Sequence, residues 1–189
     1  MTNFKFENTH INNLETVTRS PVQDSRGNFD KLFCEADFSR YNKNISISQI
    51  NLSRTNKLGT LRGLHYQKFP FLEKKIVSCV RGKIFDVVID IRQDSPTFLK
   101  HYSIILSSES DKSVLIPEGF AHGFQSLEDN CEVLYMHTNT YQPDYEAGLN
   151  CFDPKLKIDW PLPVSNISKR DSEFENLTSD FLGIPTHEM

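Results

Sequence analysis

The sequence predicts an all-β protein, built as an antiparallel sandwich, a jelly roll or a barrel. Short segments in which apolar and polar residues alternate fill the middle of the chain, and turn residues separate them roughly every 8–12 residues. Helical patterns are few and short. The chain has 189 residues, 38% of them hydrophobic and 24% charged, which is enough to bury one core. We therefore expect one domain over residues 1–189.

The first half of the chain contains four predicted strands and one short helix. The helix covers residues 34–42, and a strand over 44–53 follows, in which isoleucines alternate with serines. A second strand is expected over 60–68. Residues 74–92 predict two strands joined at Arg81-Gly82, a dipeptide typical of a hairpin turn.

The second half continues this pattern and ends with a helix. We expect strands within residues 98–108, 112–127 and 131–141. Turn residues separate the segments, at 94–96, 117–119, 128–130 and 143–144. A short helix is expected near the C-terminus, over residues 168–177.

The segment over 60–68 is unusually polar for a half-buried strand. Strict alternation divides it into one face with Leu61, Gly63, His65 and Gln67 and another with Arg62, Leu64, Tyr66 and Lys68. Buried polar side chains are costly unless they are hydrogen-bonded or line a wet cavity. We therefore expect His65 and Gln67 to line a pocket, together with Gln49 and Asn51 if the two strands are neighbours. His122, which lies among glycines in residues 116–124, is a second histidine for this pocket.

Charge and cysteine content narrow the class of protein. The net charge of −4 gives no reason to expect nucleic acid or an anionic membrane as a partner, although a local basic pocket can still bind a small anion. No apolar signal segment and no run of about 18 apolar residues occurs, so neither a signal peptide nor a membrane span is expected. The four cysteines, Cys34, Cys79, Cys131 and Cys151, form no C-x-x-C pair. They predict reduced thiols in a cytoplasmic protein, without a structural zinc site.

Eight segments, in this order along the chain, resemble the dTDP-4-dehydrorhamnose 3,5-epimerase family of dTDP-sugar epimerases. They are "DSRGNF" (24–29), "SQINLS" (48–53), "LRGLHYQ" (61–67), "KIVSCVRGKIFDVVIDIRQDSPTF" (75–98), "IPEGFAHGF" (116–124), "LY" (134–135), "IDWPLP" (158–163) and "SKRD" (168–171). The resemblance implies a cupin-type jelly-roll barrel with a few short helices, a homodimer and no cofactor. It also implies a nucleotide-linked 4-keto-6-deoxyhexose as substrate, with dTDP as the expected nucleotide.

The reaction implied by the resemblance inverts C3, C5 or both carbons of the keto sugar. A carbon next to the ketone loses a proton, the charge moves to O4 as an enolate, and a proton returns on the opposite face. The resemblance assigns His65 as the base, Asp171 as the carboxylate that orients it, and Tyr135 as the proton donor. Such a product would enter a lipopolysaccharide, a capsule or a glycosylated natural product.

The remaining site residues also come from the resemblance. Lys75 and Arg62 match cationic groups near O4 and the diphosphate. The positions that match other substrate contacts are His122, Gln49, Asn51 and Tyr141. Arg26 and Phe29 match residues that reach the nucleotide from the partner subunit of the dimer.

Structural interpretations of the same residues stay open. His65 can be a hydrogen-bonded core histidine, and Tyr135 can be a cross-strand packing residue. Asp171 with Ser168 resembles a helix capping box, so its role can be only structural. Lys75 can be an exposed strand lysine.

The other histidines do not form a recognisable metal site. A metal-dependent cupin needs an H-x-H pair, and this chain has His65-Tyr66-Gln67, so no metal is expected and a cupin oxygenase is disfavoured. His101 and His137 belong to no motif, and we expect them at the surface or in packing.

Two departures from the family pattern leave the exact substrate open. Thr140-Tyr141 stands where many members have two adjacent aromatic residues, and Lys31 stands where rhamnose-pathway members often have a glutamate. One alternative is therefore an epimerase that inverts only C3 or only C5, or that uses a GDP- or CDP-linked sugar. An alternative of another class is a non-catalytic cupin that binds a sugar nucleotide.

Overall fold

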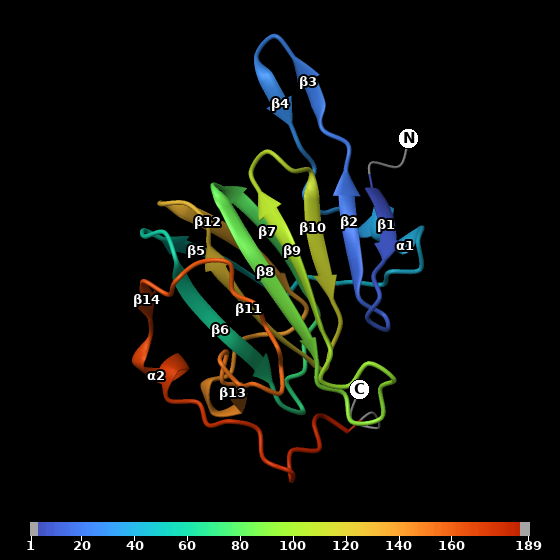
Figure 1. Cartoon of the computed structure of the whole chain (residues 1–189). Coiled ribbons are helices and arrows are strands. Elements are labelled where there is room, and N and C mark those ends of the chain that lie inside the picture. The colour runs from blue at the N-terminus through green and yellow to red at the C-terminus, as the bar shows by residue number, and fades with distance from the viewer. Residues whose placement is uncertain (1–3, 186–189) are drawn as a thin grey trace.

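The computed structural model describes residues 4–185 and confirms the all-β prediction (Figure 1). The strands are β1 (Phe4–Asn8), β2 (Glu15–Arg19), β3 (Val22–Asp24), β4 (Gly27–Phe29), β5 (Gln49–Thr55), β6 (Thr60–Gln67), β7 (Lys75–Arg81), β8 (Lys83–Asp90), β9 (His101–Ser107), β10 (Lys112–Ile116), β11 (Phe120–Ser126), β12 (Cys131–His137), β13 (Glu146–Gly148) and β14 (Asn166–Ile167). The helices are short: α1 (Glu35–Ser39), the 3-10 turn η1 (Pro143–Tyr145) and α2 (Lys169–Ser172). No helix within residues 4–185 is long and apolar enough to cross a membrane.

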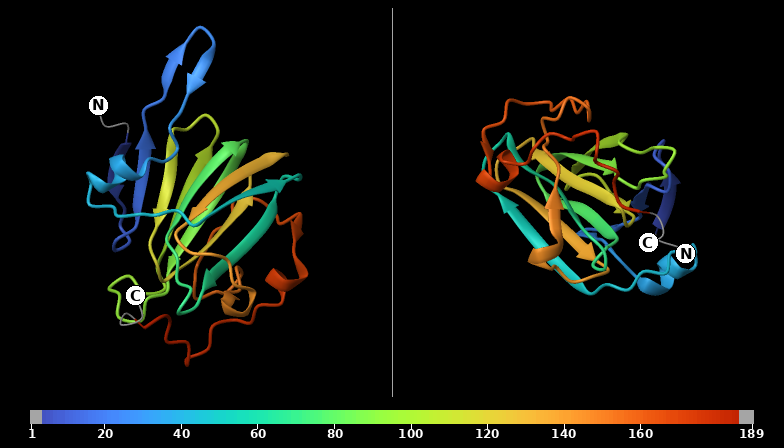
Figure 2. Two further views of the ribbon diagram at one scale, coloured as in Figure 1. Left: turned by 180° about the vertical axis from the view of Figure 1, so that it is seen from behind. Right: turned by 90° about the horizontal axis from the view of Figure 1, so that it is seen from below.

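Two antiparallel sheets face each other and enclose the main core. The first has the order β1-β2-β10-β7-β12-β5, and the second has the order β13-β6-β11-β8-β9, with the short β14 added in parallel beside β6. The core between them draws residues from both sheets, among them Val77 and Val133 of the first and Val88 and Phe124 of the second. Figure 2 shows the two sheets from behind and from below. The active-site candidates occupy the part of this interior that apolar side chains do not fill.

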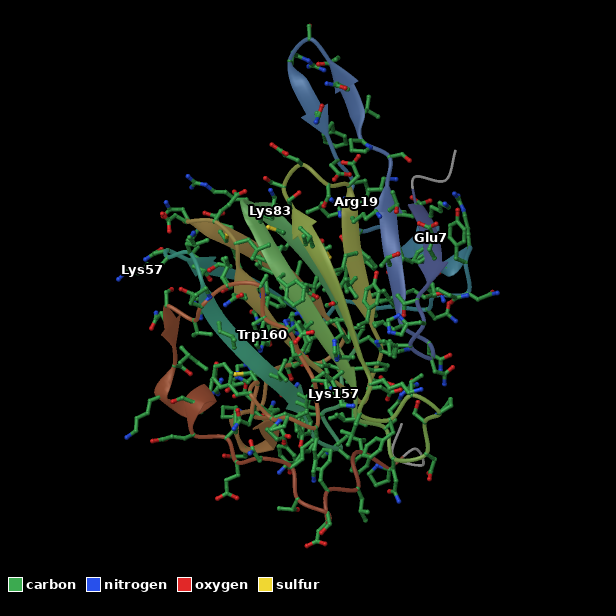
Figure 3. All side chains as sticks on the ribbon, in the orientation of Figure 1. Glu7, Arg19, Lys57, Lys83, Lys157 and Trp160 are labelled. Carbon is green, nitrogen blue, oxygen red and sulfur yellow. The ribbon has the colours of Figure 1, made fainter. Side chains whose placement is uncertain are left out.

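Each outer face of the sandwich is covered in part by segments outside the two sheets. The segment with α1 lies against the first sheet, where Phe38 packs with Phe4 and Ile76. Residues 149–184 lie against the second sheet, and Trp160, labelled in Figure 3, contacts Phe85 of β8 with ring centroids 5.9 Å apart. Because β8 is buried on both faces, its sequence is a nearly continuous apolar run.

The observed elements differ from the predicted ones at their ends. The strand expected over 44–53 begins at Gln49, and the C-terminal helix expected over 168–177 ends at Ser172. The segment 112–127 contains two strands, β10 and β11, with the expected turn between them. The strands over 44–53 and 60–68 are not neighbours, since β5 and β6 lie in different sheets, but Gln49, Asn51, His65 and Gln67 still line one cavity. The strands β1 to β4 were not predicted.

A β-bulge interrupts the strict alternation expected for β6. The register against β11 shifts between His122 and Phe124, opposite Gly63. As a result Arg62 and His65 both line the cavity, while Leu61 and Leu64 both pack in the core on the other face. The prediction that Arg62 and His65 lie on opposite faces was therefore wrong.

Glycine is required at this bulge. Gly63 has a φ of +115°, and a Cβ there would lie 2.6 Å from the Cα of Gly123 on β11. A side chain at Gly63 would therefore be both strained and in collision with the neighbouring backbone. The two glycines let β6 and β11 approach closely, and this approach brings Arg62 to the same side as His65.

Candidate active site

One cavity of about 650 Å³ between the two sheets collects most of the predicted site residues. His65, Tyr135 and Asp171 line it, and so do the predicted substrate contacts Gln49, Asn51, Arg62, Lys75, His122 and Tyr141. The residues of β5, β7 and β12 form one wall, because these strands belong to the first sheet. The residues of β6 and β11, together with α2, form the wall opposite.

His65 and Asp171 form a hydrogen-bonded pair on the β6 wall. The His65 Nε2 atom lies 2.8 Å from Asp171 Oδ1, and the backbone N–H of Gly63 donates to Asp171 Oδ2 at 3.1 Å. Burial opposes ionisation of Asp171, but the hydrogen bonds from His65 and Gly63 lower its pKa to about 2. An ionised Asp171 holds the hydrogen of His65 on Nε2 and leaves a lone pair on Nδ1.

The helix-cap interpretation of Asp171 holds for its backbone and not for its carboxylate. Ser168 is the N-cap residue of α2, and its hydroxyl accepts a hydrogen bond from the Asp171 N–H at 3.0 Å. The cap therefore fixes the backbone of Asp171. The carboxylate points instead to His65 and Gly63, so the local helix places the carboxylate at the site.

A second histidine–carboxylate pair lies beside the first. His122 on β11 is opposite His65 in the strand register, and its Nε2 is 2.7 Å from Asp86 Oδ2. Both side chains are buried, and Asp86 Oδ1 has no hydrogen-bond partner among the described residues. Asp86 was not predicted as part of the site, since it stands in the apolar run of β8 with no local motif.

Tyr135 stands on the opposite wall with its phenol protonated. Its ring lies between those of His122 and His137, with centroid distances of 5.9 Å and 6.0 Å. Burial raises the pKa of Tyr135 far above its ordinary value, and the nearby Asp86 carboxylate adds to this. The phenol is therefore an acid that keeps its proton until a stronger base, such as an enolate carbon, is in contact with it.

Two cations are held in the cavity by protein acceptors. The Lys75 ammonium lies 3.0 Å from Glu73 Oε1, and the Arg62 guanidinium donates to Thr55 Oγ1 at 3.0 Å and to the Arg54 carbonyl at 3.1 Å. These bonds leave other N–H groups of both side chains available. The cavity can therefore stabilise negative charge on a bound molecule.

Arg26 and Phe29 do not reach this cavity within the chain. They belong to the β3–β4 hairpin, which projects from the body of the molecule in Figure 1. The Arg26 side chain is 88% exposed and paired with Asp24, and Phe29 is 76% exposed. Lys31, just beyond the hairpin, donates to Asp37 at 2.9 Å.

The cavity contains polar residues that sequence reasoning missed. Glu146 and Arg170 form an ion pair beside His65, and Arg170 Nη2 lies 3.0 Å from His65 Nε2. His137, expected at the surface or in packing, is buried at 9% exposure and packs on Tyr135, and it also lines the cavity, which was not expected. The other histidine without a motif, His101, contacts the Leu156 carbonyl and lies outside the cavity. Over residues 4–185, no group of three or more His, Cys, Asp or Glu side chains is arranged to hold a metal ion.

Comparisons with known proteins agree on one family. A family model described as dTDP-4-dehydrorhamnose 3,5-epimerase matches residues 8–179. The dTDP-4-dehydrorhamnose 3,5-epimerase of Methanothermobacter thermautotrophicus is 38% identical over 183 residues, which cover 94% of this chain and 96% of the relative. A dTDP-4-dehydrorhamnose 3-epimerase of Streptomyces niveus is 38% identical over 129 residues, which cover 68% of this chain and 62% of the relative.

A solved structure from the same family has the same fold as this chain. The dTDP-6-deoxy-D-glucose-3,5-epimerase of Legionella pneumophila, in complex with dTDP-4-keto-L-rhamnose, has a TM-score of 0.90 and 35% identity to this chain. The match covers 96% of this chain and 98% of that one. It confirms the predicted cupin-type jelly roll. With the family model, the relatives and the fold in agreement, the chain belongs to the dTDP-4-dehydrorhamnose 3,5-epimerase family.

Proposed function

We propose that this protein is an isomerase that inverts C3 and C5 of a dTDP-linked 4-keto-6-deoxyhexose. One observation carries the proposal: a carboxylate-paired histidine and a protonated tyrosine face one cavity from opposite walls. An epimerase needs a base on one face of a carbon and an acid on the other. A cavity with His65 and Tyr135 on opposite walls meets this need.

The mechanism begins at the Nδ1 atom of His65. This atom takes the proton from the carbon next to the ketone, and Asp171 stabilises the imidazolium that forms. The electron pair moves to O4, where Lys75 stabilises the enolate. Tyr135 then donates its phenolic proton to the opposite face of the same carbon. The ketone itself makes the carbon acidic enough, so the proposed reaction uses no cofactor.

The nucleotide end of the substrate is proposed to lie toward Tyr141 and the partner subunit. Tyr141 is 46% exposed at the mouth of the cavity, and its hydroxyl donates to Glu146 at 2.8 Å. The projecting hairpin with Arg26 and Phe29 supports a homodimer in which each hairpin closes the site of the other chain. Light scattering should report twice the chain mass of 21.8 kDa, and a fully active monomer would contradict this arrangement.

Two further proposals concern the chain as a whole. We infer that residues 1–189 form one epimerase domain, because both sheets contribute to one core and one cavity. We also infer that it acts in the cytoplasm, where the free thiols Cys34, Cys79, Cys131 and Cys151 stay reduced.

The test is proton exchange on the sugar. The protein is incubated with dTDP-4-keto-6-deoxyglucose in D₂O, and the sugar is followed by NMR. Deuterium at both C3 and C5 with inversion at both is the expected result. Deuterium and inversion at C3 alone would assign the chain to the activity named for the Streptomyces niveus relative. Binding without any exchange would identify a non-catalytic sugar-nucleotide binder.

A further inference from the structure

Glu73 joins two side chains of the cavity wall that carries Tyr135. Its Oε1 accepts from the Lys75 ammonium at 3.0 Å, and its Oε2 accepts from His137 Nδ1 at 2.8 Å. The Glu73 side chain is only 7% exposed. Burial opposes its ionisation, but the hydrogen bond from His137 and the charge of Lys75 lower the pKa of Glu73. It is therefore a carboxylate with both oxygens occupied by cavity residues.

The hydrogen bonds continue from His137 to the mouth of the cavity. In the His137 tautomer whose Nδ1–H points to Glu73, the Nε2 atom is an acceptor, and it faces Asn51 Nδ2 at 3.4 Å. Asn51 Oδ1 then accepts from Gln49 Nε2 at 3.1 Å, and Gln49 Oε1 accepts from the Tyr141 backbone N–H at 2.9 Å. Each donor and acceptor in this series has one consistent direction, and Glu73 at one end and the Tyr141 backbone N–H at the other fix the orientation of both amides.

We propose that Glu73 and His137 are positioning residues of the epimerase site, which orient Lys75 at one end and the amides of Asn51 and Gln49 at the other. The inference rests on the proposed function, because it concerns how that site is held in shape. With one Lys75 hydrogen directed to Glu73, the other two are aimed at the substrate oxygen rather than free to rotate. At the other end, Asn51 and Gln49 present fixed donors and acceptors to the sugar nucleotide.

The two ends of the series predict different kinetic effects. Glu73→Gln leaves one acceptor where two donors point, so Lys75 or His137 loses its partner. We expect kcat to fall by roughly tenfold to a hundredfold, the loss typical of a misplaced catalytic group. His137→Asn keeps a donor near Glu73 but removes the acceptor that faces Asn51. It should raise KM up to roughly tenfold, as for one lost hydrogen bond, with little change in kcat.

Two further variants separate positioning from simple stability. His137→Gln places an amide near the position of Nε2 and should restore most of the substrate affinity lost in His137→Asn. Glu132→Gln is the matched control. Glu132 lies on β12, the strand that also holds His137, but it pairs with Arg54 and Arg81 and does not line the cavity. It should keep the kcat and KM of the unchanged protein.

The experiment measures kcat and KM for dTDP-4-keto-6-deoxyglucose, and thermal unfolding, for all four variants beside the unchanged protein. The kcat loss in Glu73→Gln and the KM increase in His137→Asn, reversed in His137→Gln, support the inference. If Glu73→Gln and His137→Asn have the same kcat and KM as Glu132→Gln while their unfolding temperatures fall, Glu73 and His137 have only a structural role and the inference is wrong. If the unchanged protein itself shows no turnover, the proposed function fails, and the inference fails with it.

Discussion

The two walls of the cavity hold their acid–base groups in opposite ways. On the β6 wall, His65 is 24% exposed and hydrogen-bonded to the ionised carboxylate of Asp171. On the β12 wall, burial keeps the phenol of Tyr135 protonated, with a smaller contribution from the nearby Asp86 carboxylate. The β6 wall therefore stabilises the positive imidazolium form of His65, and the β12 wall disfavours the negative phenolate form of Tyr135. The comparison teaches that the environment of each wall, more than the residue type, sets which group is base and which is acid.

The largest effect is expected from removal of the base. His65→Ala should abolish deuterium wash-in at the sugar, since a positioned base typically contributes ~10²–10⁴-fold. The imidazole is lost, but Asp171 still accepts the hydrogen bond from the Gly63 N–H, so the fold should persist. NMR of the sugar in D₂O measures the rate. Exchange at the unchanged rate would remove His65 from the mechanism and the β6 wall from its assigned role.

Removal of the acid should separate exchange from inversion. In Tyr135→Phe the enolate still forms at His65, and the imidazolium often returns a proton to the original face. We expect deuterium wash-in to continue with retention, while net inversion falls more steeply. The ratio of inverted to exchanged sugar measures this directly. An equal fall of both rates would mean that the two walls do not act on opposite faces.

Asp171→Asn tests whether the pair on the β6 wall needs its charge. Asparagine keeps much of the shape but cannot stabilise an imidazolium, and it can favour the wrong His65 tautomer. Exchange and inversion should fall together, by less than in His65→Ala. Both rates near the unchanged level would mean that Asp171 serves only the helix α2, because asparagine caps and packs there nearly as well.

The same carboxylate should give the β6 wall a pH-dependent stability. Its pKa falls from 3.8 to about 2 on folding, so the ionised form stabilises the protein by about 2 kcal/mol. Because the folded pKa is the lower one, this stabilisation is present above about pH 4 and is lost as the pH falls toward about 2. Urea unfolding should show the stability difference from Asp171→Asn shrinking over this window. A difference independent of pH would contradict the assignment.

The sequence predicted the two walls unequally. On the β6 wall, His65 and Arg62 share one segment, and the family resemblance supplied Asp171 in "SKRD", 106 residues from His65. One error on this wall, the relative facing of Arg62 and His65, came from the bulge at Gly63, which depends on the close approach of Gly123 in another strand. A period-2 pattern cannot reveal a contact that distant residues create.

The β12 wall depends more on tertiary structure. Glu73 lies in a connection between strands, and its partner His137 is 64 residues away, so neither has a local signature. On the opposite wall, Asp86 is hidden in a similar way, within the apolar run of β8. The β3–β4 hairpin was missed for a related reason, since its strands are three residues long and fully exposed. Such short polar strands carry no burial pattern from which to predict them.

The smallest effect, no change at all, is expected from metal chelation. A metal between the walls would need several ligands that converge on one point, and within residues 4–185 no three His, Cys, Asp or Glu side chains are placed to do so. The cavity histidines are instead hydrogen-bonded to carboxylates at 2.7–2.8 Å: His65 to Asp171, His122 to Asp86, and His137 to Glu73. Dialysis against a strong chelator should therefore leave the exchange and inversion rates unchanged, with a zinc-dependent hydrolase treated in parallel to show that the chelator acts. A loss of activity that added iron, zinc or nickel restores would overturn the argument, because the walls would then be linked through a metal rather than kept chemically separate.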